Sequence, residues 1–435
     1  MTNALLSINI VNTPLLATFY VLSIAAVLYL IIRRPTARWI ATALVGILAG
    51  AVIGAVTVLL VDVLDAFGMP LPFTADVWII ATFAAVGLAI VNLWSSRWWR
   101  KVIAAISIVL LVITGTLGVN AFFGLNQTVG SLFGIASGDA INVGPHTNTP
   151  SAQPTGPLYA RWHPPANMPK TGKVGLLTGK DAIPNTLSHF PARDASLYLP
   201  PAAQVANAPA LPLVVLMMGY PGNPDPSFIA AVLDKYAAAH EGLAPIAIVA
   251  DQITGANIDP ACTDSPKLGN AQTYINEDVV NWAKSHLNIL SSPQYWTIAG
   301  YSNGGACAFK FAAQSPTLWG NALVISGDEF PGVEIQAQTI RDAFGGNQAA
   351  FDAAKPTSIL KAHPGAYTKS LAIFTVGGND PGFIPGVERN AKAAEAAGFA
   401  TTYYVVPGAG HVVDALNGGL EKGFEVLYPR LGLSK

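Results

Sequence analysis

Four long apolar runs dominate the first 125 residues of this 435-residue chain. They lie near 14 to 32, 39 to 61, 77 to 95 and 102 to 123. Each is close to the ~20 apolar residues that a helix needs to cross a hydrocarbon core about 30 Å thick. Only nine charged residues occur in this region, all outside the runs: Arg33, Arg34, Arg38, Asp62, Asp65, Asp76, Arg97, Arg100 and Lys101. The sequence therefore predicts a transmembrane domain of four helices over residues 1 to 125.

The connections between these runs differ in charge. All charged residues of the first and third connections are arginine or lysine, whereas all charged residues of the second are aspartate. Positively charged loops stay on the cytoplasmic side of a membrane. We therefore expect a multi-pass protein of the cytoplasmic membrane, with everything after residue 125 on the extracytoplasmic side. No ionisable residue lies mid-run, so a transporter or channel is not expected; the helices either only anchor the chain or also present a lipid substrate.

The rest of the chain divides into a spacer and an outer domain. Residues 126 to 170 contain seven prolines among Gly, Asn, Thr and Ser, which predicts a Pro-rich linker. Beyond it, short β-branched runs alternate with amphipathic stretches. Strands are predicted at 173–177, 196–199, 213–219, 246–251, 295–300, 322–327, 371–377 and 402–406, and helices at 226–240, 271–287, 304–314 and 387–397. This alternation predicts an α/β domain over 171 to 435, with a mostly parallel central sheet flanked by helices.

A candidate nucleophile follows the predicted strand at 295–300. The sequence Gly300-Tyr301-Ser302-Asn303-Gly304 is a G-x-S-x-G elbow, in which the serine occupies a strained turn between a strand and a helix. The glycines leave room for the backbone and for neighbouring elements to approach closely. We therefore expect Ser302 to act as a nucleophile.

A serine nucleophile needs a base and a group that orients the base. His411 follows the last predicted strand in a glycine-rich loop, where the base of an α/β-hydrolase belongs. The order Ser, acid, His places the acid between 302 and 411. Asp380 fits this order best, because it comes just after the strand at 371–377, and Asp328 with its neighbour Glu329 is the main alternative.

The developing oxyanion of an acyl transfer needs hydrogen-bond donors. The N–H of Asn303, directly after the nucleophile, is one candidate, and the N–H of Tyr220, in the turn after the strand at 213–219, is the other.

The chain has no HExxH, no clustered Cys and His, no P-loop and no GxGxxG that opens a βαβ unit. A formal net charge of −1 provides no basic field for nucleic acid. We expect no metal, no other cofactor, no nucleotide and no nucleic acid.

The outer domain resembles the esterase D and mycolyltransferase-like branch of the α/β-hydrolase superfamily, found in actinobacterial envelopes. The resemblance rests on GYSNGG at 300–305, MGYPG at 218–222, GGND at 377–380, PGAGH at 407–411 and the segment from Cys262 to Val279. It covers about 60% of the chain and implies an α/β-hydrolase domain after the four helices. The resemblance does not include the four helices, which are inferred independently; together, the two inferences predict a membrane-anchored envelope esterase.

These observations predict a serine ester hydrolase that works through an acyl-enzyme. The expected partners are the lipid bilayer and an envelope lipid or glycolipid ester, with an acyl or aminoacyl group as the part transferred to water. Two alternatives remain open: an acyltransferase that moves an acyl group to an envelope sugar, and a non-catalytic envelope binding module.

The chain has two cysteines, Cys262 and Cys307. The charge pattern places both outside the membrane, where disulfides persist, so we predict that they are bonded. The alternative is a buried thiol at Cys307 packed as a small hydrophobe.

Overall fold

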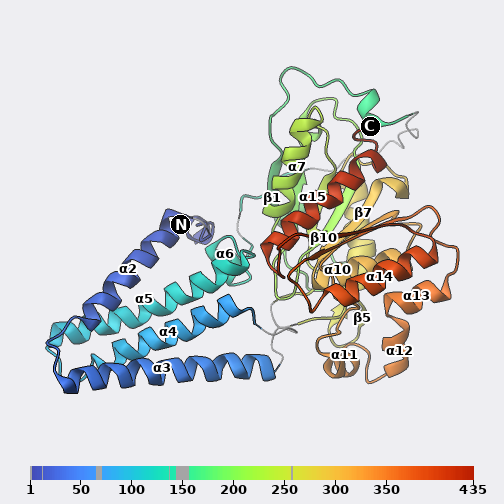
Figure 1. The fold of residues 1–435 in the computed structure, drawn as a ribbon. Coiled ribbons are helices and arrows are strands. Elements are labelled where there is room, and N and C mark those ends of the chain that lie inside the picture. The colour runs from blue at the N-terminus through green and yellow to red at the C-terminus, as the bar shows by residue number, and fades with distance from the viewer. Residues whose placement is uncertain (1, 12, 65–70, 137, 144–155, 256–257) are drawn as a thin grey trace. The chain divides into compact units, whose positions relative to one another are not determined.

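A computed structural model describes residues 2–11, 13–64, 71–136, 138–143, 156–255 and 258–435. The chain forms two units, Met1–Leu132 and Phe133–Lys435, which are described separately below (Figure 1). The boundary between them falls inside the predicted linker over 126 to 170. Residues 144 to 155 of that linker and the charged residue Asp65 lie outside the described residues.

The first unit contains the four predicted apolar helices. They are α2 (Pro14–Ile31), α3 (Ala37–Val63), α4 (Phe73–Val91) and α5 (Trp98–Phe123), accompanied by the short helices α1 (Thr2–Leu6) and α6 (Val129–Leu132). By length and composition, each of the four long helices could cross a membrane, as the sequence predicts. Many of their large apolar side chains, such as Leu48 and Ile106, are exposed rather than packed against a neighbouring helix.

Helices α3 and α4 approach closely because glycines line their contact. Gly46, Gly50 and Gly54 are the buried residues of α3 and recur every fourth position. An added Cβ at Gly50 would collide with the backbone carbonyl of Phe83, and one at Gly87 would collide with that of Gly46. Small residues at such spacing let membrane helices pack backbone to backbone.

Arg100, near the start of α5, binds the last turn of α2. Its guanidinium donates to the carbonyl oxygens of Tyr29 (3.0 Å), Leu30 (2.8 Å) and Ile32 (3.2 Å). Its Nε donates to Asn92 Oδ1 (2.9 Å). The last carbonyls of a helix have no partner within the helix, so this arginine satisfies the C-terminal end of α2.

The second unit is built on an eight-stranded sheet in the order β1-β2-β4-β3-β7-β8-β9-β10. The strands are β1 (Lys173–Leu176), β2 (Ser196–Leu199), β3 (Leu213–Met217), β4 (Ile246–Ala250), β7 (Trp296–Tyr301), β8 (Asn321–Ile325), β9 (Leu371–Gly377) and β10 (Ala400–Val406). All neighbours from β4 to β10 are parallel, whereas β2 is antiparallel to β1 and β4. Strands β5 (Asp264–Ser265) and β6 (Gly269–Asn270) form a separate ribbon. The eight predicted strands and the mostly parallel sheet are confirmed.

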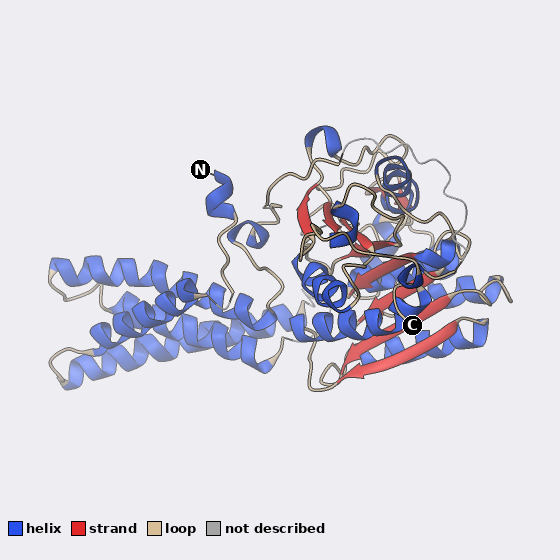
Figure 2. Cartoon of the chain, turned by 90° about the horizontal axis from the view of Figure 1, so that it is seen from above, coloured by secondary structure: helices blue, strands red, loops and turns tan. Residues whose placement is uncertain are grey.

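Helices cover both faces of this sheet (Figure 2). Consecutive strand residues point to opposite faces. On one side of β9, Phe374 packs against Phe309 of α10 (Asn303–Gln314) with ring centroids 4.9 Å apart. On the other, the neighbouring Thr375 lies against Gly419 of α15 (Val413–Arg430). Strands β3, β4, β7, β8 and β9 are buried throughout, as expected for parallel strands between two helical layers.

The helices of this unit are α7 (Ser227–Ala239), α8 (Ala271–Thr273), α9 (Val279–His286), α10 (Asn303–Gln314), α11 (Gln336–Asp342), α12 (Gln348–Ala353), α13 (Pro356–Ala362), α14 (Ile384–Ala397) and α15 (Val413–Arg430). A π-turn at Tyr274–Asp278 joins α8 to α9, and 3₁₀ turns lie at Leu158–Ala160, Gly179–Asp181, Pro201–Gln204 and Pro293–Tyr295. The last part of the predicted linker packs on this unit, where Tyr159 N donates to Gly432 O (3.0 Å) and Trp162 Nε1 to Glu241 O (2.9 Å).

Candidate active site

Ser302 stands on a sharp turn between β7 and α10. Its backbone has φ 55° and ψ −123°, a left-handed conformation that is strained for a residue with a side chain. Glycines on either side make the turn possible, because a Cβ at Gly300 would collide with the backbone of Gly304, and one at Gly304 with the carbonyl of Met217. The predicted elbow thus has the strand, turn and helix that the motif requires.

The structure brings Ser302, His411 and Asp380 together in one chain of contacts. Ser302 Oγ lies 2.9 Å from His411 Nε2, and His411 Nδ1 lies 2.8 Å from Asp380 Oδ2. An ionised carboxylate only accepts hydrogen bonds, so Nδ1 carries the proton and Nε2 is left to accept from the serine hydroxyl. His411 and Asp380 have only 8% and 2% of their side chains exposed, which keeps this contact out of bulk solvent.

Backbone hydrogen bonds between two loops position the acid and the base. Gly378 N donates to Val406 O (2.9 Å), and Asn379 N donates to Ala409 O (2.8 Å). The Asn379 side chain adds a bond from Nδ2 to Gly408 O (3.0 Å). The loop after β9 is thereby joined to the loop after β10, which fixes Asp380 beside His411.

Two aromatic rings enclose the imidazole of His411. Phe383 stacks on it with ring centroids 3.7 Å apart, and Tyr301 stacks at 5.2 Å. Both rings are buried, with 7% and 1% of their surface exposed. They leave the imidazole edge free to reach Ser302 on one side and Asp380 on the other.

The alternative acids lie elsewhere. Glu329 pairs with Arg389, whose Nε is 2.7 Å from Glu329 Oε1. Asp328 is buried, and burial together with nearby Glu334 raises the pKa of its carboxyl well above the usual range. A group that resists ionisation is poorly suited to stabilise an imidazolium, and the contact with His411 belongs to Asp380.

The loop predicted to supply the second oxyanion donor lies against the nucleophile. A Cβ on Gly219 would come within 3.3 Å of Ser302 Cβ. The next residues turn sharply through a cis Tyr220–Pro221 bond, and a Cβ on Gly222 would collide with the carbonyl of Gly219. Asn303 begins α10 on the other side of Ser302. Both candidate donor residues, Tyr220 and Asn303, therefore belong to segments that adjoin Ser302.

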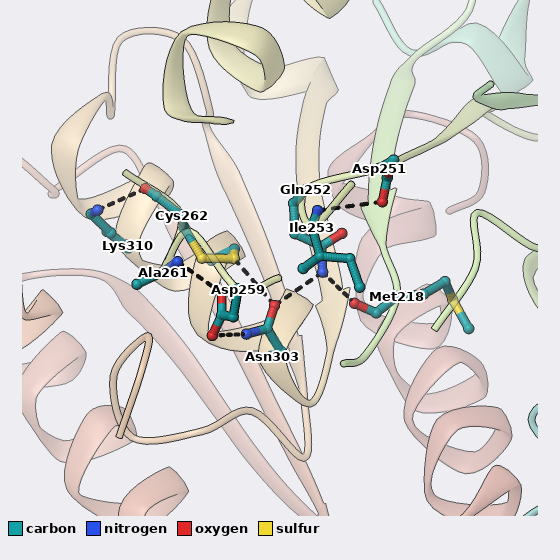
Figure 3. The surroundings of a disulfide bond; sticks show 10 residues. Met218, Asp251, Gln252, Ile253, Asp259, Ala261, Cys262, Asn303 and Lys310 are labelled. Atoms are coloured by element: carbon teal, nitrogen blue, oxygen red, sulfur yellow. Dashed lines mark hydrogen bonds between the residues drawn. A yellow bond between two sulfur atoms is a disulfide. The ribbon is translucent and has the colours of Figure 1, made fainter. Parts of the chain in front are cut away.

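Cys262 and Cys307 are joined by a disulfide with a Cα–Cα distance of 5.4 Å (Figure 3). Beside it, the buried Lys310 donates from Nζ to Cys262 O (2.7 Å). Burial lowers the pKa of Lys310 to about 7. The buried carboxyl of Asp259 accepts from Ala261 N (2.7 Å), and burial raises the pKa of this carboxyl.

The described ranges contain no group of three or more His, Cys, Asp or Glu side chains placed to hold a metal ion. Of the other described histidines, His286 and His363 bond through Nδ1 to carbonyl oxygens within their own helical segments. The ring of His240 is tilted against that of Tyr428, with ring centroids 4.9 Å apart. None of these three contacts involves Ser302.

Comparison with known proteins identifies the family of the chain. Residues 192–419 match the Esterase family model, which is more than half of the chain. The chain belongs to this esterase family. Membership supports a carboxylic-ester hydrolase of the α/β-hydrolase superfamily, as the sequence predicts.

A relative in Corynebacterium glutamicum, known as an uncharacterised protein, is 34% identical over 257 residues, which are 57% of this chain and 60% of that protein. The chain thus matches less than two thirds of this relative's length. An S-formylglutathione hydrolase from Agrobacterium tumefaciens is 17% identical with a TM-score of 0.49, covering 61% of this chain and 98% of that enzyme. A ferulic acid esterase is 16% identical with a TM-score of 0.48, covering 60% and 99%.

Several residues around the site were not predicted from the sequence. Phe383 lies three positions after Asp380, but nothing in the sequence indicates that it stacks on His411. Asp251 and Gln252 directly follow β4, and both side chains are buried. Polar residues just after a buried parallel strand are the signal that could have found them, because ligand sites form at the carboxyl edge of such sheets.

Proposed function

We propose that the second unit hydrolyses carboxylic esters through a Ser302, His411 and Asp380 triad. The supporting observation is the unbroken contact from Ser302 Oγ through both nitrogens of His411 to Asp380, with Ser302 on a strained elbow. Membership of the esterase family supports the same class of reaction.

In the first half of the proposed reaction, Ser302 Oγ attacks the ester carbonyl while His411 Nε2 takes the hydroxyl proton. The N–H groups of Asn303 and Tyr220 stabilise the negative charge on the tetrahedral intermediate. The intermediate collapses, and the alcohol leaves with the proton from Nε2. Asp380 holds the imidazole in the required tautomer and stabilises the imidazolium.

In the second half, a water molecule replaces the alcohol. His411 Nε2 removes a proton from the water as it attacks the acyl-enzyme carbonyl, and a second oxyanion forms in the same place. Collapse releases the carboxylic acid and returns the proton to Ser302. Acyl transfer to an envelope sugar would use the same acyl-enzyme with a sugar hydroxyl in place of water.

The four apolar helices support a membrane anchor. Four crossings, with the arginine- and lysine-rich connections in the cytoplasm, would place the second unit on the extracytoplasmic side. The disulfide is consistent with that oxidising compartment. We infer that the substrate is an acyl or aminoacyl ester of the cell envelope. Reporters fused after residue 435 and in the loop near Arg34 should be active on opposite sides of the membrane, and the reverse pattern would overturn the proposed orientation.

The catalytic proposal is tested with full-length protein in detergent and p-nitrophenyl butyrate. Ser302→Ala should lower kcat by at least about 10⁴-fold, because the nucleophile is lost. Ser326→Ala is the matched control: Ser326 is a buried serine after neighbouring β8, and its hydroxyl makes no hydrogen bond to the described residues. Equal activity in wild type and Ser302→Ala would reject the triad, and a wild type without turnover would favour a binding module.

A partition experiment separates hydrolysis from transfer. An activated acyl donor is supplied with rising trehalose, and free acid and acylated sugar are both measured. Hydrolysis predicts mainly free acid at millimolar sugar. If acylated sugar dominates, the transferase alternative replaces the hydrolase.

A further inference from the structure

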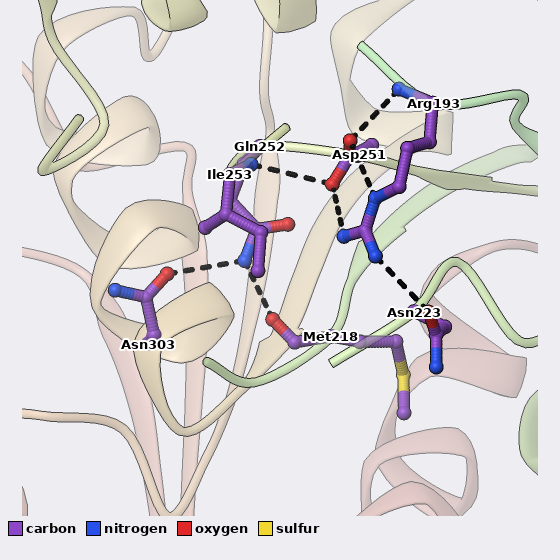
Figure 4. Close-up of polar contacts among 7 residues, drawn as sticks. All are labelled: Arg193, Met218, Asn223, Asp251, Gln252, Ile253 and Asn303. Carbon is purple, nitrogen blue, oxygen red and sulfur yellow. Dashed lines mark hydrogen bonds and ion pairs between the residues drawn. The ribbon is translucent and has the colours of Figure 1, made fainter. Parts of the chain in front are cut away.

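The two residues that follow β4 have different partners: Gln252 is bonded to Met218 and Asn303, and Asp251 is bonded to Arg193 (Figure 4). Asp251 and Gln252 have only 1% and 2% of their surface exposed. A buried polar side chain is costly unless its hydrogen bonds are made, so their partners indicate what holds them in place.

Gln252 connects two segments that flank the nucleophile. Its Nε2 donates to the carbonyl oxygen of Met218 at 2.6 Å and to the side-chain oxygen of Asn303 at 3.1 Å. An amide nitrogen has two hydrogens, and both are used here. Met218 precedes the Gly219–Gly222 turn, and Asn303 is the first residue of α10. A single side chain therefore spans the gap between the two proposed sources of oxyanion donors.

The distance between α10 and the end of β3 is also fixed by direct packing. A Cβ on Gly304 would lie 2.6 Å from the Met218 carbonyl oxygen, so α10 already packs directly on the end of β3. The Gln252 bond fixes the direction of the Met218 carbonyl and hence the peptide plane from which the turn to Tyr220 starts. The direction of the Tyr220 N–H depends on that start.

The other end of the Asn303 side chain is also held. Its Nδ2 donates to Asp259 Oδ2 at 3.0 Å, and Asp259 Oδ1 accepts from Ala261 N at 2.7 Å (Figure 3). Cys262 follows at once and is bonded to Cys307, which lies four residues after Asn303. The amide of Asn303 is thus fixed between Gln252 and a loop that the disulfide ties to the same helix.

A separate ion pair holds the far end of the turn. Arg193 donates to both carboxylate oxygens of Asp251, at 2.7 and 3.0 Å, and its third nitrogen donates to Asn223 Oδ1 at 3.0 Å. Asn223 directly follows the Gly219–Gly222 turn. The two residues after β4 therefore secure the turn at both ends, Asp251 through Arg193 and Gln252 directly.

We propose that Gln252 is a positioning residue for the oxyanion hole, keeping the N–H groups of Tyr220 and Asn303 aimed at one point. This inference rests on the proposed function, because an oxyanion hole has a role only if an oxyanion forms. Gln252 is buried and bonds to Met218 and Asn303, so in this proposal it acts through these two residues.

The test replaces Gln252 with methionine, which has similar length and no donor, in the full-length protein. Acylation and deacylation both pass through an oxyanion, so kcat should fall while KM changes by less than about twofold. Removing an oxyanion donor outright costs about 10²–10³ in kcat. A misaligned donor should cost less, and we expect a loss of about tenfold. Binding of phenylboronic acid, whose adduct with serine is tetrahedral and anionic, should weaken by a similar factor.

Asn321→Leu is the matched control. Asn321 is fully buried at the start of β8, the strand end remote from Ser302, and its amide donates to the carbonyl oxygens of Gln294 (2.9 Å) and Trp296 (3.2 Å). Asn321→Leu removes the same kind of buried amide as Gln252→Met. It should lower the melting temperature but leave kcat and boronate affinity unchanged per folded molecule. If Gln252→Met does not fold, Asn303→Ala keeps the N–H, loses the bond from Gln252 and should show the same kcat-only loss.

The possible outcomes distinguish a failure of this inference from a failure of the proposed function on which it rests. A wild type with no turnover and no boronate inhibition would overturn both. An active wild type with unchanged kcat in Gln252→Met would overturn the role of Gln252 alone. A loss of kcat without loss of boronate affinity would overturn it as well, because the defect would then lie outside the oxyanion hole.

Discussion

The apolar helices of the first unit and the candidate site of the second unit differ in how some of their hydroxyl groups are bonded. In the first unit, Thr42, Thr82 and Ser107 each donate to the carbonyl four residues earlier on the same helix. In the second, the contact between Ser302 and His411 joins residues 109 positions apart, and that between His411 and Asp380 joins residues 31 apart. Local bonds suit an apolar helix, whereas long-range contacts bring the candidate site together. The proposed chemistry therefore belongs to the second unit, and the first unit is the proposed anchor.

The largest effects should come from the triad. Asp380→Asn should lower kcat by about 10⁴-fold, because an asparagine that donates to His411 would favour the wrong imidazole tautomer. Ester turnover by the full-length protein is the measurement, with circular dichroism to verify folding. If Asp328→Asn were the damaging change and Asp380→Asn mild, the acid would be misassigned.

The disulfide should contribute strongly to the stability of the second unit. It closes a loop with a sequence separation of 45, which corresponds to about 4 kcal/mol of stabilisation in the chain-entropy picture. Replacing Cys262 and Cys307 together with serine should therefore lower the midpoint of urea unfolding markedly. Thiol labelling of denatured, unreduced protein provides the companion measurement. Two free thiols there would contradict the bridge.

A change in the first unit should affect stability without affecting catalysis. Gly50→Leu would force a side chain into the backbone of α4, and overpacking typically costs about 1–3 kcal/mol. The neighbouring Ala49→Leu is the control, because Ala49 is exposed. Thermal unfolding in detergent should separate the two variants, while kcat per folded molecule stays at the wild-type value in both. A tenfold loss of kcat in Gly50→Leu would contradict the assignment of all chemistry to the second unit.

The smallest effect concerns pH. Burial raises the pKa of Asp328, so the folded state holds this proton more tightly than the unfolded state. The stability that the group contributes is complete below its unfolded pKa, near 4, and is lost as pH rises through the higher folded pKa. Asp328→Asn should therefore stabilise the protein more at pH 8 than at pH 4.5. Melting temperatures of both proteins at the two pH values test this, and an equal difference would contradict it.

Much of the fold could be predicted because its signals are local. The strands β3, β4, β7, β8 and β9 are buried on both faces and read as continuous apolar runs. The elbow was visible because only glycine fits at Gly300 and Gly304. The short helices α11, α12 and α13 were not predicted, since six or seven residues give too little periodicity to recognise.

The site could be predicted only in part, because some of its contacts depend on strand order. Gln252 follows β4, and its role depends on β4 lying next to β3 and on β3 lying next to β7. The choice of Asp380 over Asp328 depends on hydrogen bonds between Asn379 and the loop that carries His411. The sequence could only rank Asp380 above Asp328 by their order in the chain. The packing of the loops after β9 and β10 is what places Asp380, rather than Asp328, in contact with His411.

The most direct test of the central proposal is to trap the nucleophile. Full-length protein is treated with a fluorophosphonate, which reacts with an activated serine hydroxyl, and the labelled peptide is identified by mass spectrometry. We predict one adduct, on Ser302, that is absent from Ser302→Ala and forms much more slowly in His411→Ala. An adduct on another residue, or ester turnover that persists in Ser302→Ala, would contradict the proposed triad.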